Sequence, residues 1–339
     1  MIEKRRITEL DALRGIAAFA VLLYHFTFKF NDIFQTGYTS KFEFSYGHYG
    51  VQLFFIISGF VIFMTLEKVQ NAFEFVYKRF SRLYPTFWIC MALTFFTVNA
   101  IGPEYLKRGF GDFVFNITMM PDYLGFRSID GAYWSLVPEL FFYLLMVFVF
   151  LSKKVKRIEI IGFFWLGLIL INYFYKLKGI NLILNLYYGC YFLAGINFYK
   201  IWKEDSKLIN HIQILLSLLV IGIINDAETF IVSTLFFIIF YLFVFEKLRF
   251  IAVKPLIYLG EISYALYLIH QFIGYTLQLN LIKVGVTSYW ILLISPILLA
   301  VILASLITYK LEKPILKVLS NFYKVKIINF LNRSKPTIS

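Results

Sequence analysis

Long apolar segments follow one another along the whole chain, and polar loops separate them. Each segment has roughly 17 to 25 residues, the length at which a helix rising 1.5 Å per residue crosses a hydrocarbon core of about 30 Å. The pattern predicts about ten transmembrane helices, of which the seventh is short. They fall at residues 9–30, 49–66, 84–101, 132–151, 158–175, 181–199, 209–224, 229–245, 256–280 and 288–309.

Composition agrees with this pattern. Of the 339 residues, 60% are hydrophobic and 16% are charged, which is more apolar than a soluble domain of this length, so we expect an all-α integral membrane protein. The first segment carries Arg14 and His25 inside its apolar run, unlike a cleaved signal sequence, and we expect it to be retained. No linker divides the chain, which predicts a single membrane domain over residues 1–339, with a basic cytoplasmic tail at about 311–339 and no additional soluble domain.

The basic residues are divided unevenly between the two sides of the predicted bundle. Of the 33 Lys and Arg residues, 24 fall on one side and 8 on the other. Because cytoplasmic loops carry the excess of Lys and Arg, both termini are predicted to be cytoplasmic. The formal charge of +13 is then a topology signal, and we expect the lipid bilayer and no nucleic acid as a partner. Cys90 and Cys190 lack the spacing of metal ligands, so we expect no metal, and the oligomeric state stays open.

Two ionisable residues share one face of the first predicted helix. Arg14 and His25 are eleven residues apart, close to three turns at 3.6 residues per turn. A charged group at the centre of a membrane helix costs roughly 2.5 to 3.5 kcal/mol, so such residues are functional candidates by default. A packing role stays open for each, because Arg14 can reach the headgroups and His25 can hydrogen-bond within the bundle.

More polar residues are predicted at the depth of His25, about 10 Å below the outer surface at 1.5 Å per residue. They are Ser58, Glu139 and His270. A carboxylate at that depth needs a partner or a proton, and His270 is a candidate partner of Glu139 or a packing residue. Ser58 has the alternative of close helix packing. Pro138 is expected to kink the fourth helix beside Glu139.

A second predicted layer, at the cytoplasmic mouth of the bundle, is basic. Arg14 shares it with Lys78, Arg79, Arg82 and the acidic Glu312. Phosphates are bound by Arg and Lys, whereas removing a proton from a hydroxyl needs a base such as His. The two layers suit an anionic donor inside and a neutral hydroxyl acceptor outside, joined by a tunnel from Arg14 to His25. The long outer loops 31–48 and 102–131 are candidate caps of the outer side.

Six sequence blocks match one family in order. They read LDALRGIAAFAVLLYHF at 10–26, YGVQLFFIISGF at 49–60, KRFSRLYPTFW at 78–88, AYWSLVPELFFYLL at 132–145, LGEISYALYLIH at 259–270 and YKLEKP at 309–314. With Arg-x10-His in the first block, the chain resembles the acyltransferase 3 family, bacterial membrane O-acyltransferases that acetylate surface sugars. Many relatives have a second acidic residue after the Glu of the fourth block, where this chain reads VPEL, so the partner of Glu139 stays open.

The resemblance implies an acyltransferase of the bacterial cytoplasmic membrane. Its donor would be acyl-CoA, usually acetyl-CoA, and its acceptor a surface polysaccharide or the lipid-linked precursor of one. The resemblance makes Arg14 and His25 the essential pair and leaves open the roles of the other residues on family positions. These are Arg79, Arg82, Trp134, Ser135, Glu139, His270 and Glu312.

A mechanism follows as a hypothesis. The cluster of Arg14, Lys78, Arg79 and Arg82 would hold the phosphates of CoA, and His25 would deprotonate the acceptor hydroxyl while Glu139 holds the imidazolium. Trp134 or Ser135 would donate to the oxyanion, and Tyr133 would contact substrate or belong to an interfacial aromatic belt. Direct transfer and an acyl-His25 intermediate are both open.

Other function classes compete with this one. A transporter or flippase of a sugar or lipid-linked sugar would use Arg14, His25 and Glu139 for coupling, but we find no inverted repeat in the sequence. A membrane sensor or scaffold would not depend on His25.

Overall fold

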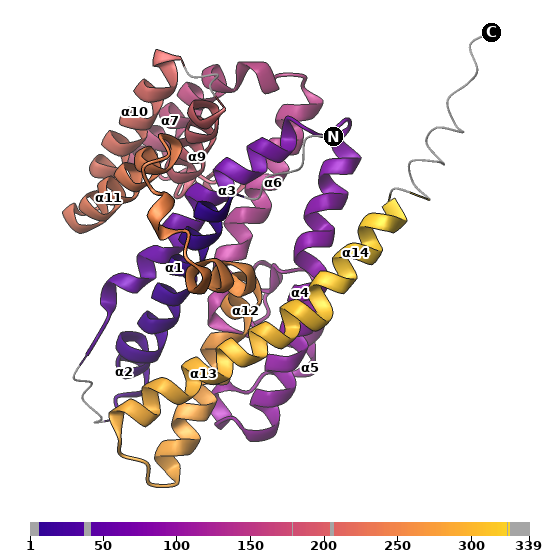
Figure 1. Ribbon diagram of the computed structural model, residues 1–339, viewed down its shortest axis with the longest axis vertical. Helices are drawn as coiled ribbons and strands as arrows, with labels where there is room; N and C mark the ends of the chain where they lie inside the picture. Colours follow the sequence, from indigo (N-terminus) through magenta and orange to yellow (C-terminus); the bar gives the residue numbers. More distant parts are fainter. Residues whose placement is uncertain (1–6, 37–41, 178, 204–206, 324, 326–339) are drawn as a thin grey trace.

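The computed structural model describes residues 7–36, 42–177, 179–203, 207–323 and 325. The predicted basic residues at 4–6 and most of the basic tail lie outside these ranges. The described part of the chain consists of helices, turns and loops, and Figure 1 shows it as an elongated bundle in which α13 and α14 run on as one long helix toward the C-terminus. Because several of its helices are long and apolar, this is a multi-pass membrane protein.

The helices have the following bounds. The first half of the chain forms α1 (Thr8–Tyr24), α2 (Phe30–Phe34), α3 (Gly50–Leu66), α4 (Ala72–Ile101), α5 (Phe110–Asn116), α6 (Leu136–Leu151) and α7 (Ile158–Tyr175). The second half forms α8 (Ile180–Ile183), α9 (Gly189–Trp202), α10 (Leu208–Ile224), α11 (Ala227–Val244), α12 (Lys254–Lys283), α13 (Tyr289–Ile307) and α14 (Lys313–Phe322).

The number of spans differs from the prediction of about ten. Within the described ranges, eight helices are long and apolar enough to cross a membrane. The predicted helices at 181–199 and 209–224 are shorter: α9 has 14 residues and α10 has 17, or about 21 and 26 Å at 1.5 Å per residue. The first of these apolar runs is interrupted because Asn185 adopts a left-handed φ of 53° and donates from Nδ2 to the Pro138 carbonyl at 2.9 Å.

Pro138 lies in the first turn of α6, shortly after the 3₁₀ turn Gly131–Ser135 ends. Backbone N–H groups in the first turn of an α-helix have no acceptor within that helix, so proline removes no hydrogen bond of α6 there. The kink expected beside Glu139 stays a prediction.

Glycines allow the central helices to approach one another closely. At the crossing of α1 and α12, a Cβ on Gly15 would lie 2.8 Å from the backbone N of Gly260. At the crossing of α3 and α9, a Cβ on Gly195 would lie 2.9 Å from the Cα of Gly59. Small residues at such contacts let membrane helices pack backbone to backbone. The α1–α12 contact brings two distant histidines together, as described below.

Two π-helical turns continue the ends of central helices. One, His25–Lys29, follows α1 directly, and the other, Thr308–Glu312, joins α13 to α14. A π turn inserts an extra residue into the helix, changes the direction of the side chains around it, and is frequent at functional sites. The first turn begins at the candidate base, and the second ends at the candidate acidic residue Glu312.

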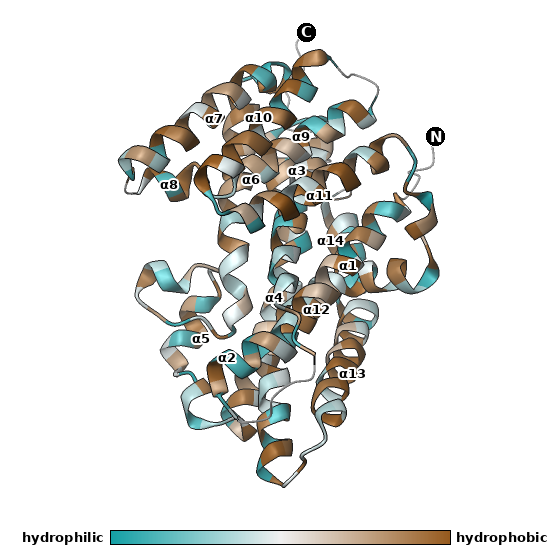
Figure 2. Ribbon diagram, turned by 90° about the vertical axis from the view of Figure 1, so that its left-hand side faces the viewer, coloured by the Kyte–Doolittle hydropathy of each residue, from teal (hydrophilic) through white to brown (hydrophobic). Residues whose placement is uncertain are grey.

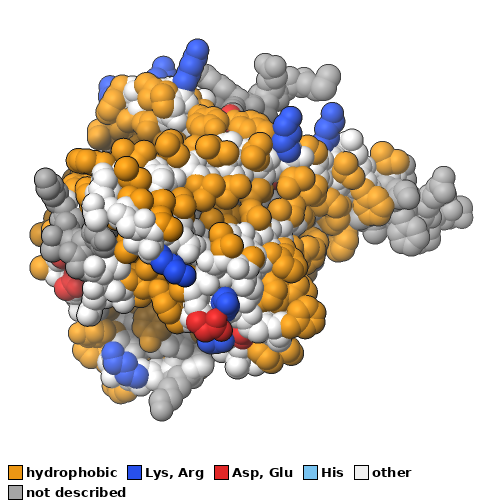
Figure 3. All heavy atoms as spheres, turned by 90° about the horizontal axis from the view of Figure 1, so that it is seen from below, with side chains coloured by type: hydrophobic (Ala, Val, Ile, Leu, Met, Phe, Trp, Pro, Cys, Tyr) orange, Lys and Arg blue, Asp and Glu red, His pale blue; other side chains and the backbone are white. Residues whose placement is uncertain are grey.

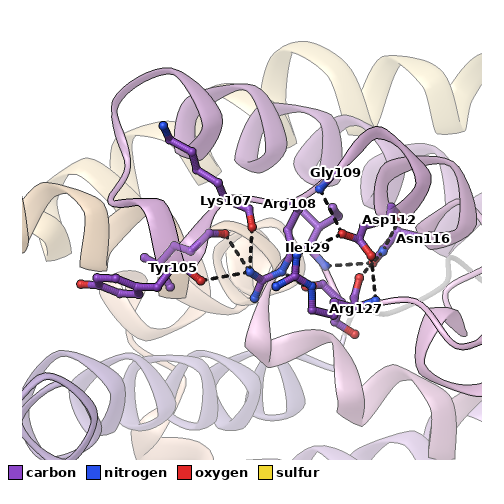
Figure 4. Close-up of polar contacts among 10 residues, drawn as sticks. Tyr105, Lys107, Arg108, Gly109, Asp112, Asn116, Arg127 and Ile129 are labelled. Atoms are coloured by element: carbon purple, nitrogen blue, oxygen red, sulfur yellow. Dashed lines mark hydrogen bonds and ion pairs between the residues drawn. The ribbon is translucent and has the colours of Figure 1, made fainter.

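The loop from α4 to α6 is folded by polar contacts among its own residues, and its role as a cap of the outer side stays a prediction. Figure 4 shows its polar contacts: Asp112 accepts hydrogen bonds from the Gly109 and Arg127 amides, and Arg108 donates to the Ser128 carbonyl at 3.0 Å. At the end of the loop, Asp130 accepts from the backbone N–H groups of Ala132 and Phe272, each at 2.9 Å. The loop is thereby fixed to the helix that carries His270.

Burial makes the Asp130 carboxyl a weaker acid than an exposed aspartate. Its side chain is fully enclosed, and this desolvation raises the pKa of its carboxyl to about 7, although the two backbone hydrogen bonds and the charge of Arg108 act in the opposite direction. The carboxyl is therefore a titrating group at the junction of the loop and α12.

The outer surface is largely apolar. Figure 2 shows brown, hydrophobic residues along most of the helices, and Figure 3, a view from below, shows hydrophobic side chains over much of one face with a few charged groups among them. Exposed leucines, isoleucines and phenylalanines of this kind are stable only in contact with lipid.

Candidate active site

Two neighbouring cavities in the described part of the bundle contain the predicted site residues. The larger, of about 620 Å³, contains Arg14 and is named the basic cavity, and the smaller, of about 410 Å³, contains His25 and is named the histidine cavity. Val51 and Tyr267 line both of them. In place of the expected common tunnel, the structure has two cavities that share one wall. Arg14 lines the cavity on one side of this wall, and His25 lines the cavity on the other side. The basic side chains of the larger cavity are Arg14, Lys68, Lys78, Arg79 and Arg82.

The cations predicted to share one layer therefore line one cavity. Arg82 forms an ion pair with Glu312, whose side chain is buried. Arg79 donates from Nη2 to the Thr65 hydroxyl at 3.0 Å. Such contacts hold the guanidinium groups at fixed positions, and a planar guanidinium with several N–H donors is suited to phosphate oxygens.

Glu139 and Ser58 form a second pair of predicted residues in the basic cavity. The Ser58 hydroxyl donates to Glu139 Oε1 at 2.8 Å, and the Tyr143 hydroxyl donates to the same oxygen at 2.5 Å. Glu139 thus has neither of the partners expected for it, since His25 and His270 bond elsewhere. Ser58 supplies one of these two hydrogen bonds and so links α3 to α6.

His25 and His270 contact each other where α1 and α12 pack together. His270 Nε2 lies 3.0 Å from His25 Nδ1, and His25 Nδ1 also lies 2.9 Å from the Val21 carbonyl. His270 Nδ1 lies 2.8 Å from the Tyr267 carbonyl. The four residues expected at one depth therefore separate into two pairs. Ser58 and Glu139 line the basic cavity, whereas His25 lines the histidine cavity and is contacted by His270, which lines neither cavity.

These contacts assign the hydrogens of both imidazoles. A carbonyl oxygen only accepts, so the Nδ1 of His270 carries a hydrogen and, in a neutral ring, its Nε2 is an acceptor. The Nδ1 of His25 then carries a hydrogen shared between His270 Nε2 and the Val21 carbonyl. His25 Nε2 is left with a lone pair in a ring that lines the histidine cavity. This is the protonation state of a general base or a nucleophile.

Tyr267 stands at the wall between the cavities. Its hydroxyl bonds to the Ser135 hydroxyl at 2.7 Å and donates to the Ala132 carbonyl at 2.9 Å. Ser135 lines the basic cavity, whereas the neighbouring Trp134 lines the histidine cavity and keeps 44% of its surface exposed. The two candidate oxyanion donors therefore face different cavities.

Tyr133 does not reach either cavity. Its ring is buried and packs 5.0 Å from that of Phe87, centroid to centroid. A substrate contact and an interfacial aromatic belt both require exposure, so the burial of Tyr133 supports neither of these expectations. Its neighbour Trp134 takes the exposed position because the short 3₁₀ turn Gly131–Ser135 points successive side chains in different directions.

Several site residues were not singled out from the sequence. Tyr143 follows Glu139 by four positions and Tyr267 precedes His270 by three, so helical periodicity could have placed each on the face of its partner. Gln52, Gln271 and His48 line the histidine cavity, but no local pattern distinguishes them. Among the described residues, no group of three His, Cys, Asp or Glu side chains is placed to hold a metal ion.

Comparison with known proteins agrees with this geometry. A sequence model of the acyltransferase domain matches residues 7–310. The O-acetyltransferase OatA of Staphylococcus aureus (strain NCTC 8325 / PS 47) is 29% identical over 334 residues, which cover 80% of this chain and 51% of that protein. The peptidoglycan O-acetyltransferase OatA of Listeria monocytogenes is 29% identical over 160 residues, covering 42% of this chain and 24% of that protein.

The chain spans about half the length of the Staphylococcus relatives that it matches. No solved structure matches it. The family match nevertheless extends over nearly all of the chain and includes the helices that carry Arg14, His25, Glu139 and His270. The chain therefore belongs to the acyltransferase 3 family.

Proposed function

We propose that this chain is a membrane O-acetyltransferase that moves an acetyl group from acetyl-CoA, bound at the basic cavity, to a carbohydrate hydroxyl in the histidine cavity. The observation that carries the proposal is the meeting of a cationic cavity and an imidazole-lined cavity at Val51 and Tyr267. The names of the relatives favour acetyl over other acyl groups.

The basic cavity suits the donor. The nucleotide end of CoA carries several phosphate charges, and Arg14, Arg79 and Arg82 offer guanidinium donors to them. Apolar side chains such as Phe54 and Leu136 complete the lining and suit the uncharged pantetheine arm. The excess of Lys and Arg in alternate loops supports placing this cavity on the cytoplasmic side, where acetyl-CoA is available.

The histidine cavity suits the chemical step. His25 Nε2 takes the proton of the acceptor hydroxyl while the hydroxyl oxygen bonds to the thioester carbonyl carbon. The C–S bond then breaks, the acetyl ester remains on the acceptor, and the proton passes from His25 to the CoA thiolate. His270 Nε2 stabilises the imidazolium by accepting its Nδ1 hydrogen. An acetyl-His25 intermediate uses the same atoms. Nε2 attacks the carbonyl carbon and the C–S bond breaks, which gives an N-acetyl imidazolium that keeps its Nδ1 hydrogen and a CoA thiolate. The acceptor hydroxyl oxygen then takes the acetyl group from Nε2, and the proton of that hydroxyl passes to the CoA thiolate.

The acceptor and the compartment belong to the proposal as well. One relative is named for action on peptidoglycan, and we propose a cell-envelope glycan or its lipid-linked precursor as the acceptor. The enzyme would then lie in the bacterial cytoplasmic membrane with both termini inside.

The test uses the full chain in lipid nanodiscs, acetyl-CoA labelled in the acetyl group, and chitopentaose, a β-1,4-linked N-acetylglucosamine oligomer. We expect base-labile label on the sugar and one free CoA thiol for each acetate transferred. His25→Ala should reduce both to background, because its Nε2 is the only group assigned to accept the proton. Transport of unmodified oligosaccharide into proteoliposomes without ester formation, or a His25→Ala protein with the wild-type rate, would overturn the proposal.

Arg14→Ala tests the donor side of the same reaction. Because Arg14 lines only the basic cavity of the two, the KM for acetyl-CoA should rise by roughly tenfold, equivalent to about 1.4 kcal/mol, while the KM for chitopentaose changes less than twofold. Equal rises in both constants would assign Arg14 to folding instead.

A further inference from the structure

The histidine cavity contains two amide side chains that the proposed reaction does not use. Gln52 comes from α3 and Gln271 from α12, and both line this cavity beside His25. The Oε1 atoms of both are buried and have no hydrogen-bond partner among the described residues, which is also true of Gln213 and Gln278. Gln271 as a whole residue is only 6% exposed. Because Gln52 and Gln271 line a cavity, their oxygens can accept hydrogen bonds from a ligand there, and such bonds remove the cost of a buried acceptor without a donor.

Other buried glutamines show what a structural amide does in this protein. Gln278 donates to two backbone carbonyls, Phe26 and Leu292, each at 3.1 Å, and so links three segments. Gln213 donates to the Glu159 carbonyl at 2.6 Å and links α10 to α7. Within the described ranges of the chain, Gln52 makes no such link between helices, and its amide instead forms part of the cavity lining.

A glycine next to Gln271 leaves space for its side chain. A Cβ on Gly131 would lie 2.8 Å from Gln271 Nε2 and 2.9 Å from its Oε1, closer than a side chain tolerates. Gly131 therefore leaves the room that the amide occupies at the cavity wall. The terminal torsion of a glutamine is broad, so the amide can turn its oxygen or its NH₂ group toward a ligand.

An aromatic surface lies in the same lining. Trp134 is half exposed, and its ring centroid lies 5.9 Å from that of Tyr188, which lines the same cavity. The axial C–H groups of a pyranose form an apolar face that packs against the electron-rich face of such a ring, while its equatorial hydroxyls project outward to hydrogen-bond. Amide groups and an exposed indole beside a base are therefore complementary to a hydroxylated sugar ring.

We propose that Gln52 and Gln271 bind hydroxyl groups of a pyranose acceptor, with one ring face on Trp134, and that they hold one hydroxyl of that ring at His25 Nε2. This assignment rests on the proposed function and adds to it the residues that select the acceptor. A glycan chain and a lipid-linked precursor both contain such a sugar ring, so the assignment applies to either acceptor.

The kinetic test replaces each amide by an isosteric apolar side chain. In Gln52→Met and in Gln271→Met, the KM for chitopentaose should rise about three- to tenfold, the range expected for losing one neutral hydrogen bond, with less than a twofold change in the KM for acetyl-CoA. Gln213→Met is the matched control, because Gln213 also has an unpartnered oxygen but lies in α10 and lines neither cavity. An unchanged acceptor KM in either variant, or an equal rise in the control, would overturn the proposal.

A binding measurement keeps the inference separate from the chemistry. Tritium-labelled chitopentaose should bind saturably to wild-type protein in nanodiscs without acetyl-CoA, and each Gln→Met variant should weaken that binding by the same three- to tenfold. Wild-type protein that binds the sugar but never acetylates it would refute the proposed function and leave this site standing. Acetylation with unchanged binding in both variants would refute the site alone. An undecaprenyl-linked disaccharide that binds at least tenfold more tightly than chitopentaose would identify the lipid-linked precursor as the source of the ring.

Discussion

Replacing His270 by phenylalanine tests the proton arrangement of the site. The ring of His270 is buried and reaches His25 Nδ1 with its Nε2 at 3.0 Å. Phenylalanine keeps an aromatic ring in this position and removes the acceptor. The second acceptor of the same hydrogen, the Val21 carbonyl at 2.9 Å, stays in place.

The size of the effect follows from this geometry. Since the Val21 carbonyl still holds the hydrogen on Nδ1, His25 keeps its lone pair on Nε2 and remains a base. What is lost is a hydrogen bond to a ring that becomes cationic in the transition state, and such bonds contribute about 1.5 to 3 kcal/mol. At about 1.4 kcal/mol for each factor of ten, kcat should fall roughly 10- to 100-fold. The KM for acetyl-CoA should stay within twofold, because His270 does not line the basic cavity.

The assay compares three proteins in nanodiscs: wild type, His270→Phe and His270→Gln. The glutamine variant restores an oxygen acceptor and should recover most of the lost rate, which a purely structural role of His270 would not predict. Thermal unfolding and gel filtration report whether each variant is folded. A wild-type kcat in His270→Phe would refute the orienting role, and a loss as large as that of His25→Ala would show that His270 itself acts on the reacting atoms.

Two further predictions concern Glu139 and Asp130. Glu139→Gln should lower kcat much less than His25→Ala, by less than about 100-fold, since Glu139 bonds Ser58 and Tyr143 rather than His25; equal losses in the two variants would contradict this. Asp130 has a pKa raised to about 7, so the unfolded chain releases its proton at lower pH than the folded protein does. Its contribution therefore lowers stability as pH rises from about 4 to 7, and the wild-type Tm should fall over this window relative to Asp130→Asn, measured in detergent; parallel Tm profiles would contradict the assignment.

The apolar segments and the basic layer could be predicted because they depend on local sequence. Length and hydropathy locate the helices, and Arg79 and Arg82 share a face through helical spacing alone. The count of ten spans stays a prediction. Eight helices of the described residues are long and apolar enough to cross a membrane, and a single left-handed residue, Asn185, divides an apolar run that hydropathy treats as continuous.

The partners of the buried groups could not be predicted in this way. His25 and His270 are 245 positions apart, and their contact depends on how closely α1 and α12 approach at Gly15 and Gly260. Depth estimates put Glu139 in the same layer as His25. Depth does not say in which direction a side chain points within that layer, and therefore on which side of α3 and α12 it lies. Tertiary packing separated the expected cluster into two pairs, Glu139 with Ser58 and His25 with His270.

The wall at Val51 and Tyr267 has an electrical consequence. If the phosphates of CoA stay in the basic cavity and only the uncharged thioester end of its arm passes this wall, no net charge crosses the protein. Moving one elementary charge through a potential of 100 mV changes its energy by about 2.3 kcal/mol, whereas moving a neutral acyl group changes it by nothing. The turnover of such an enzyme would be indifferent to the membrane voltage, and the cell could modify its envelope without dissipating its ion gradients.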